Sequence, residues 1–125
     1  MDLGELIKAL EAEPDQGKVL PLGLGHPDSY RGFYEQLEFN PVADVTVGQV
    51  LADARSAVAA TFQGWKGGEY VMGESTPCWL AYRGTGCGEE IGPVLLTLLL
   101  SAPGLPAEDQ AALRKHAGRW GPGEF

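Results

Sequence analysis

The sequence has few of the residues that most clearly indicate metal binding or thiol chemistry. It contains two cysteines and two histidines among 125 residues. Cys78 and Cys87 are nine positions apart and far from His26 and His116, so no zinc-ligand spacing occurs. We therefore expect no metal and no cofactor. The two thiols are expected to be reduced, and a disulfide across a hairpin is the alternative.

Basic residues are also scarce. Nine Lys and Arg residues stand against 17 Asp and Glu residues, which gives a formal net charge of −8. This balance argues against binding to nucleic acid or to an anionic membrane, because both attract basic protein faces. It still allows a small anionic ligand held by a few local Arg and Lys side chains.

Long hydrophobic runs are missing as well. The longest apolar stretch, Pro93 to Leu100, is interrupted by Thr97 and is well short of the roughly 20 residues of a membrane helix. The first ten residues, MDLGELIKAL, lack the basic and apolar regions of a secretory signal. We therefore expect a cytoplasmic protein.

The rest of the composition is typical of a globular chain. Hydrophobic residues make up 44% of the sequence and charged residues 21%, which separates it from disordered chains. A chain of this length fits one domain and can bury roughly two-thirds of its unfolded surface. We predict an α+β domain over residues 1–103 and a C-terminal extension over 104–125, with a short helix and a tail.

Two segments have clear helix signals. Over Asp2–Glu13, apolar residues recur with helical spacing, and the first residue forms a capping-box pattern with Glu5. Over Thr46–Ala60, the first residue forms the same pattern with Gln49. Pro106, followed by acidic residues, predicts a short terminal helix.

Five segments are predicted as strands, and glycine-rich or proline-rich loops separate them. Gly25–Gly32 is predicted as a loop, and Pro41 is expected to end the second strand. The last strand is apolar on both faces, as in a central strand. We predict an α+β fold with a mostly antiparallel sheet of about five strands, two main helices on one face and a short C-terminal helix. The predicted strands are Lys18–Leu24, Phe33–Phe39, Glu69–Met72, Cys78–Tyr82 and Gly92–Leu100.

The most unusual local cluster runs from Tyr30 to Tyr34. Its arginine, Arg31, could hold a phosphate through two parallel hydrogen bonds, and its aromatic rings could stack on a base. The alternative is that these rings fill the core while Arg31 pairs with a surface carboxylate. For Trp79, on a predicted central strand, core packing is the favoured interpretation.

Two glycine-rich stretches could cradle a phosphate, since free backbone N–H groups beside a cation bind anions. They are Gly64–Gly68, which contains Lys66, and Gly84–Gly88, which follows Arg83. Ordinary tight turns are the alternative. The candidate ligand-binding residues are Ser29, Tyr30, Arg31, Tyr34, Lys66, Gly67, Gly68, Tyr70 and Arg83.

No set of residues indicates catalysis. His26 and Ser29 share a predicted loop, but turn capping explains the serine better. The adjacent Glu89 and Glu90 are typical of a solvated acidic patch. We therefore expect no enzymatic activity, and degradation of a nucleotide by His26 and Ser29 is the lesser hypothesis.

The motifs Ser29-Tyr-Arg-Gly-Phe-Tyr34 and Lys66-Gly-Gly-Glu-Tyr-Val-Met72 resemble those of a family of small bacteriophage-encoded α+β proteins. The resemblance covers roughly residues 1–100 in the same order. It departs around residues 83–92, where an Asn and a shorter turn would be expected, and residues from 104 onward have no counterpart. Further matching segments are Leu3–Leu10, Thr46–Leu51, Thr61–Met72 and Thr76–Trp79.

The resemblance implies a phage protein that acts in the cytoplasm of the host cell. Small phage proteins without catalytic residues include sponges, which sequester the nucleotide second messengers of bacterial defence. By this analogy we expect a non-enzymatic homo-oligomer that binds a cyclic ADP-ribose isomer or a cyclic oligonucleotide. The alternative is an acidic protein that inhibits a host protein by direct binding. The acidic residues that would serve this alternative are Glu35, Glu38, Glu89 and Glu90.

Overall fold

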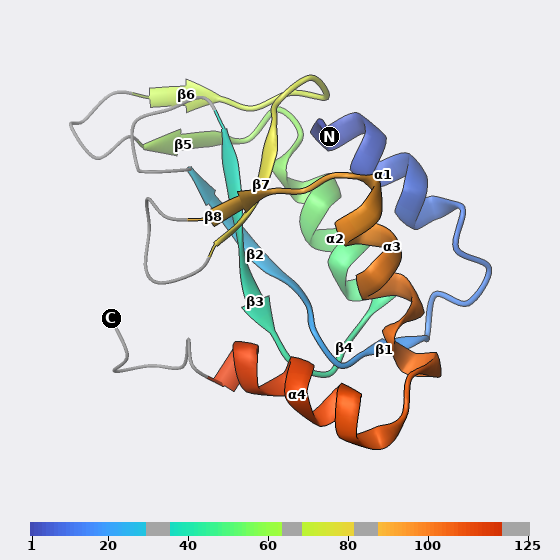
Figure 1. The fold of residues 1–125 in the computed structure, drawn as a ribbon. Coiled ribbons are helices and arrows are strands. Elements are labelled where there is room, and N and C mark those ends of the chain that lie inside the picture. The colour runs from blue at the N-terminus through green and yellow to red at the C-terminus, as the bar shows by residue number, and fades with distance from the viewer. Residues whose placement is uncertain (30–35, 64–68, 82–87, 119–125) are drawn as a thin grey trace.

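The computed structural model describes residues 1–29, 36–63, 69–81 and 88–118, and within them the chain has the predicted α+β composition. Four strands form the main sheet, the first three helices gather on one side of it, and the last helix lies across its end (Figure 1). The helices are α1 (Leu3–Glu11), α2 (Val47–Ala57), α3 (Pro93–Ser101) and α4 (Ala107–Gly118), with the short 3-10 helix η2 (Ala102–Gly104) after α3. The strands are β1 (Val19–Leu20), β2 (Gly23–Ser29), β3 (Leu37–Val42), β4 (Val45–Thr46), β5 (Thr61–Gln63), β6 (Glu69–Val71), β7 (Cys78–Ala81) and β8 (Gly88–Glu90).

Helices α1 and α2 begin where the sequence predicts. The Asp2 carboxylate accepts a hydrogen bond from the backbone N–H of Glu5 at 2.8 Å, and the Glu5 carboxylate accepts one in return. Thr46 and Gln49 make the same reciprocal pair at the start of α2. Each capping box satisfies backbone N–H groups that have no partner within the helix, so the two predicted capping boxes are confirmed.

The main sheet has the strand order β2-β3-β7-β8. β3 and β7 are parallel, whereas β2–β3 and β7–β8 are antiparallel. Two further antiparallel pairs, β1–β4 and β5–β6, lie apart from it. The pairing of described strands is thus mostly antiparallel as predicted, but they form three sheets rather than one sheet of about five strands. The parallel pair arises because the chain passes through α2, β5 and β6 between β3 and β7 (Figure 1).

The hydrophobic core lies between the main sheet and helices α1, α2 and α3. Side chains alternate along a strand, so Leu37 and Phe39 of β3 and Cys78 and Leu80 of β7 all face the helices. Leucines and valines of the three helices pack against them. These helix residues are Leu3, Leu6, Leu10, Val47, Val50, Leu51, Leu96 and Leu99.

The predicted strand over Gly92–Leu100 is wrong, because this segment is helix α3. Gly92 is the N-cap and Pro93 the first helical residue, where the missing N–H of proline costs nothing. The backbone N–H of Leu96 donates to the carbonyl of Gly92 at 3.0 Å. A short run of apolar residues is compatible with a strand or a helix by its pattern alone, and proline after glycine was the signal for a helix start.

The predicted loop over Gly25–Gly32 is also wrong for its described part, since β2 continues to Ser29. Pro41 does not end β3 but pairs with Leu24 inside the ladder. β7 pairs only with Leu37 to Phe39, so the N–H that Pro41 lacks costs no hydrogen bond to β7. The register between β2 and β3 shifts between Leu24 and Pro27, which marks a bulge.

The first residues of the chain join the end of the sheet. The backbone N–H of Leu3 donates to the Thr76 carbonyl at 2.8 Å, and that of Gly4 to the Glu74 carbonyl at 2.7 Å. A Cβ atom on Gly4 would lie 3.2 Å from Glu74, so glycine permits this close approach. The Met1 ammonium donates to the carbonyl of Ile91, 90 positions away.

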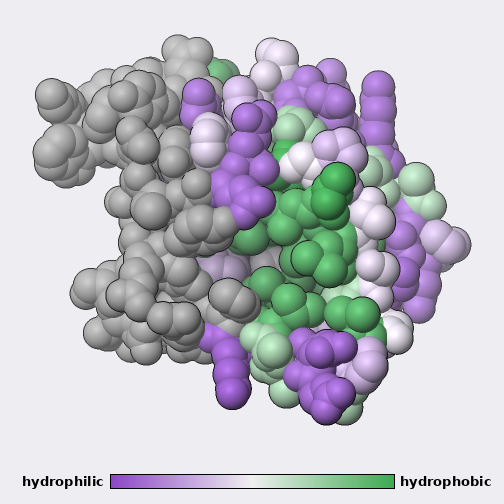
Figure 2. Space-filling view, viewed as in Figure 1, coloured by the Kyte–Doolittle hydropathy of each residue, from purple (hydrophilic) through white to green (hydrophobic). Residues whose placement is uncertain are grey.

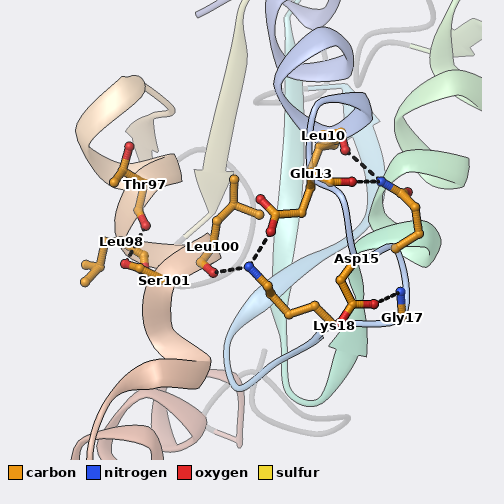
Figure 3. Close-up of polar contacts among 10 residues, drawn as sticks. Leu10, Glu13, Asp15, Gly17, Lys18, Thr97, Leu98, Leu100 and Ser101 are labelled. Atoms are coloured by element: carbon orange, nitrogen blue, oxygen red, sulfur yellow. Dashed lines mark hydrogen bonds and ion pairs between the residues drawn. The ribbon is translucent and has the colours of Figure 1, made fainter.

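Polar contacts attach the last two helices to the remainder of the fold. The Lys18 ammonium bridges the Glu13 carboxylate and the Leu100 carbonyl at the end of α3 (Figure 3). The Arg114 guanidinium on α4 donates to Asp44, in the turn between β3 and β4, at 2.9 Å. α4 therefore lies across the end of the sheet where β3 turns into β4 (Figure 1).

Candidate functional site

The segments predicted to bind the ligand each connect two antiparallel strands. Residues 30–35 join β2 to β3, residues 64–68 join β5 to β6, and residues 82–87 join β7 to β8. Ser29 belongs to β2 and Tyr70 to β6, but the structure describes only the backbone of these two residues. The other seven candidates lie outside the described residues: Tyr30, Arg31, Tyr34, Lys66, Gly67, Gly68 and Arg83.

The strand register separates two of these connections. Ser29 pairs with Leu37, which in turn lies beside Cys78 at the start of β7. The connection after β7 leaves from Ala81, three residues further along the strand. Ser29, after which residues 30–35 begin, and Ala81, after which residues 82–87 begin, are thus offset by about 10 Å along the direction of β7.

A row of polar residues crosses the face of the main sheet opposite α1, α2 and α3. Asp28 pairs with Glu38, Glu38 with Trp79, and Trp79 with Glu90, so these four positions lie side by side on β2, β3, β7 and β8. Their neighbours on β3, β7 and the residue after β8 face the helices, which places the row on the other face. We call Glu38, Trp79 and Glu90 the sheet row.

Burial differs sharply along the sheet row. The Glu38 side chain is only 1% exposed, whereas Trp79 is half-buried and Glu90 is exposed. The Glu90 carboxylate lies 3.5 Å from the Met1 ammonium. The proposed role of Glu38 in a surface acidic patch is therefore wrong, and Trp79 is absent from the core beneath the helices. Glu89 and Glu90 are exposed, as expected. Glu35 lies outside the described residues.

Cys78 is a free thiol in the core. Burial raises its pKa to about 12, and the carboxylates of Asp2 and Glu90 add to the rise against the opposing Met1 ammonium. A thiol with this pKa is protonated near neutral pH, so Cys78 does not supply a nucleophilic thiolate. Cys87 lies outside the described residues.

The one described histidine whose side chain is placed, His26, lies at the surface. Its ring nitrogen Nδ1 is 3.7 Å from the Asp53 carboxylate on α2, and its side chain is 74% exposed. Among the residues that the structure describes, no three His, Cys, Asp or Glu side chains gather as a metal site would require. His26 is therefore a surface group, and in the described part of the chain it is not held as a base beside a nucleophile.

A groove of about 510 Å³ lies between the end of α1 and α2. Its polar groups already have partners: the Arg55 guanidinium donates to Glu11 at 2.6 Å, and the Gln16 amide donates to the carbonyls of Leu10 and Glu13. The hydrogen bonds that hold the turn after α1 together, over residues 12–18, are drawn in Figure 3. Because its charges neutralise one another, the groove does not attract an anion.

Comparison of the chain with protein-family models, with curated proteins and with solved structures gives no match. The resemblance to the phage family therefore stays a prediction. In the described ranges, no helix is long and apolar enough to cross a membrane.

Proposed function

We propose that the protein binds a nucleotide second messenger, of the cyclic ADP-ribose or cyclic oligonucleotide class, and sequesters it unchanged. The observation that supports this proposal is the pairing of half-buried Trp79 with exposed Glu90 in the sheet row. An indole provides a flat apolar surface on which a base can stack. A carboxylate accepts hydrogen bonds from the amino groups of a base. The two groups together suit the base of a nucleotide.

The phosphates of such a ligand need a different part of the protein. The sheet row has two carboxylates, and the whole chain has a net charge of −8, so a phosphate is repelled there. Arg31, Lys66 and Arg83 are the proposed phosphate partners. Arginine binds phosphate through two parallel N–H groups and lysine as a point charge.

Sequestration is favoured over turnover by the state of the described nucleophile and base. Cys78 is buried and protonated, and His26 faces Asp53 at the surface. Neither group is arranged for nucleophilic attack on a bound phosphate ester or glycosidic bond. A site built from two subunits would enclose more of the ligand than a site on one subunit, so the proposal includes a homo-oligomer.

Thermal unfolding in the presence of a nucleotide panel tests the proposal. The panel contains cyclic ADP-ribose isomers, cyclic di- and trinucleotides, NAD and ADP-ribose. A ligand at 100 times its dissociation constant adds about 2.7 kcal/mol, which raises the melting temperature by several degrees. The ligand released by heat should have an unchanged mass. A changed mass would show an enzyme, and no shift with any compound would contradict the proposal.

Arg31→Ala should weaken binding of the identified nucleotide by about 2–3 kcal/mol, or roughly 30- to 150-fold, because a charge-assisted contact is lost. Titration calorimetry measures the effect. Arg114→Ala is the matched control, since Arg114 lies exposed on α4 and donates to Asp44, in the turn between β3 and β4. Unchanged affinity in Arg31→Ala would exclude this arginine from the site. If that variant unfolds, Arg31 is structural.

A further inference from the structure

Trp79 and Glu90 lie next to each other at one edge of the main sheet. They are directly opposed in the antiparallel pair of β7 and β8, and β8 is the last strand in the order β2-β3-β7-β8. Opposed residues of an antiparallel pair share a face, and their Cβ atoms are about 4.5–5.5 Å apart. One planar group can therefore contact the indole of Trp79 and the carboxylate of Glu90 together.

The two neighbours of Trp79 in the sheet row differ in their access to a ligand. Glu90 is 54% exposed, whereas Glu38, on the other side of Trp79, is buried. A base that lies on the half-buried indole can approach the Glu90 carboxylate but not that of Glu38. Of these two carboxylates, Glu90 is therefore the one that can bind the edge of a stacked base.

A cation holds the Glu90 carboxylate in place. The Met1 ammonium lies 3.5 Å from the Glu90 atom Oε2 and donates a hydrogen bond to the Ile91 carbonyl. The separation from Glu90 is longer than the about 2.7–3.2 Å of an N–H···O hydrogen bond. The ion pair thus orients the carboxylate while its oxygens keep their capacity to accept hydrogen bonds from a ligand.

A carboxylate distinguishes bases by the donors and acceptors along their Watson–Crick edges. Guanine presents two adjacent donors, N1–H and the 2-amino group, and the two oxygens of one carboxylate accept both. Adenine and cytosine present an amino group beside a ring nitrogen whose lone pair repels a carboxylate oxygen. Uracil presents a single N–H between two carbonyls. Guanine is therefore the common base that matches a carboxylate best.

We propose that Trp79 and Glu90 select guanine, so that the sequestered messenger is a cyclic oligonucleotide that contains this base. The inference rests on the function proposed above and narrows it, because cyclic ADP-ribose isomers contain adenine. The indole stacks on the base, and the Glu90 carboxylate accepts hydrogen bonds from N1–H and the 2-amino group. Glu90 thereby determines which base is bound.

The apolar surface over α3 cannot make this distinction. Figure 2 shows hydrophobic side chains gathered over α3, which lies on the helix side of the sheet, and the helix has no charged residue. Its large exposed apolar residues are Val94 and Leu98, and neither side chain forms hydrogen bonds. A base bound there would have similar affinity whatever its edge, so equal binding of guanine and adenine ligands would indicate that surface instead.

Titration calorimetry with cyclic di-GMP, cyclic di-IMP and cyclic di-AMP tests the inference on the unmodified protein. The hypoxanthine of cyclic di-IMP keeps the N1–H of guanine but lacks its 2-amino group. The protein should bind cyclic di-GMP about tenfold or more tightly than cyclic di-AMP, with cyclic di-IMP between them. Equal or tighter binding of cyclic di-AMP, or binding of a cyclic ADP-ribose isomer alone, would overturn guanine selection but leave nucleotide sequestration standing. Binding of no nucleotide would overturn both.

Glu90→Gln tests which carboxylate selects the base. An amide has one donor and one acceptor, which suits adenine, so this variant should lose the preference for cyclic di-GMP. Glu89→Gln is the matched control. It removes the same charge from β8, but Glu89 is opposed to Leu80 and lies on the face toward the helices, so the preference should remain.

The ratio of the two affinities is the quantity to compare, because removing a negative charge strengthens binding of any anionic ligand. An unchanged ratio in Glu90→Gln would overturn the role of Glu90. An equal loss of preference in Glu89→Gln would overturn it as well, since general charge rather than contact with the base would then explain the selection.

Discussion

At the scale of single residues, Cys78 shows how position changes chemistry. The thiol lies in the core between β7 and the helices, and its Sγ is 3.7 Å from the Thr76 carbonyl. A cysteine in this place acts as a small apolar side chain. Cys78 is a free thiol, whereas Cys87, the other cysteine of the expected reduced pair, lies outside the described residues.

Cys78 should make stability depend on alkaline pH. In the folded protein its pKa is about 12, whereas in the unfolded chain it is near the ordinary value of 9.0. Above pH 9 the unfolded chain loses this proton first, so unfolding becomes easier by about 1.4 kcal/mol for each pH unit up to about 12. Below pH 9 the thiol is protonated in both states and contributes no pH dependence.

Urea unfolding at pH 8, 9 and 10 measures this effect. The unmodified protein should lose more stability between pH 9 and pH 10 than the Cys78→Ala variant loses. The variant controls for the other groups that titrate in this range. Parallel losses in the two proteins would show that the folded environment leaves the ionisation of Cys78 unchanged.

Glu38 is the residue at which sequence and structure disagree most. An isolated glutamate between Leu37 and Phe39 fits the outer face of a strand, and nothing in its neighbours predicts burial. The structure places it in the sheet row beside Trp79, only 1% exposed. A strand pattern reveals which residues face the helices, but not what covers the opposite face.

At the scale of elements, α3 offers a direct test of helix against strand. In a strand Leu96 and Leu98 would share a face, whereas in α3 they do not. Leu96→Ala and Leu99→Ala should each destabilise the protein by about 2–5 kcal/mol, because both side chains are buried. Leu98→Ala should cost less than about 1 kcal/mol. Chemical denaturation measures all three, and a loss at Leu98 as large as those at Leu96 and Leu99 would favour the strand, in which both faces are covered.

Elements with local start signals were predictable from the sequence. Asp2 with Glu5 and Thr46 with Gln49 define helix starts through contacts three residues apart, and both helices form there. The terminal helix after Pro106 was predicted by the same kind of local signal and is α4. These signals need no knowledge of the remainder of the fold.

Elements that depend on distant partners were not predictable. The sequence predicts a connection between Cys78–Tyr82 and Gly92–Leu100, but Gly88–Glu90 forms strand β8 because it pairs with β7. The parallel pairing of β3 with β7 follows from the path of the chain in three dimensions rather than from either sequence. The candidate ligand site has the same difficulty, since the proposed phosphate partners belong to three separate connections between strands.

At the scale of the whole molecule, excess negative charge opposes the compact state. The net charge is −8, and the exposed ion pairs Arg55–Glu11 and Arg114–Asp44 each contribute at most about 1 kcal/mol. Salt screens the repulsion among all carboxylates at once. Salt also weakens the ion pairs, but the stability lost in this way is smaller than the stability gained from the screened repulsion.

Raising NaCl from about 0.02 M to 0.3 M should therefore increase the melting temperature by a few degrees. Circular dichroism during heating measures it. A variant with Glu108→Gln and Asp109→Asn has two fewer negative charges and should show a smaller increase. A melting temperature that falls with salt would show that ion pairs outweigh the general repulsion.

The attachment of the first residues to the end of the sheet has a consequence for the order of folding. α1 receives its partners from Glu74, Thr76 and Ile91, so its docking closes a loop of most of the chain. Contacts so distant in sequence slow folding, because the loop entropy is lost before the contact forms. On a ribosome the first helix would wait on the order of ten seconds for these partners to be made. A segment that is synthesised well before its partners is thus among the last to reach its final place.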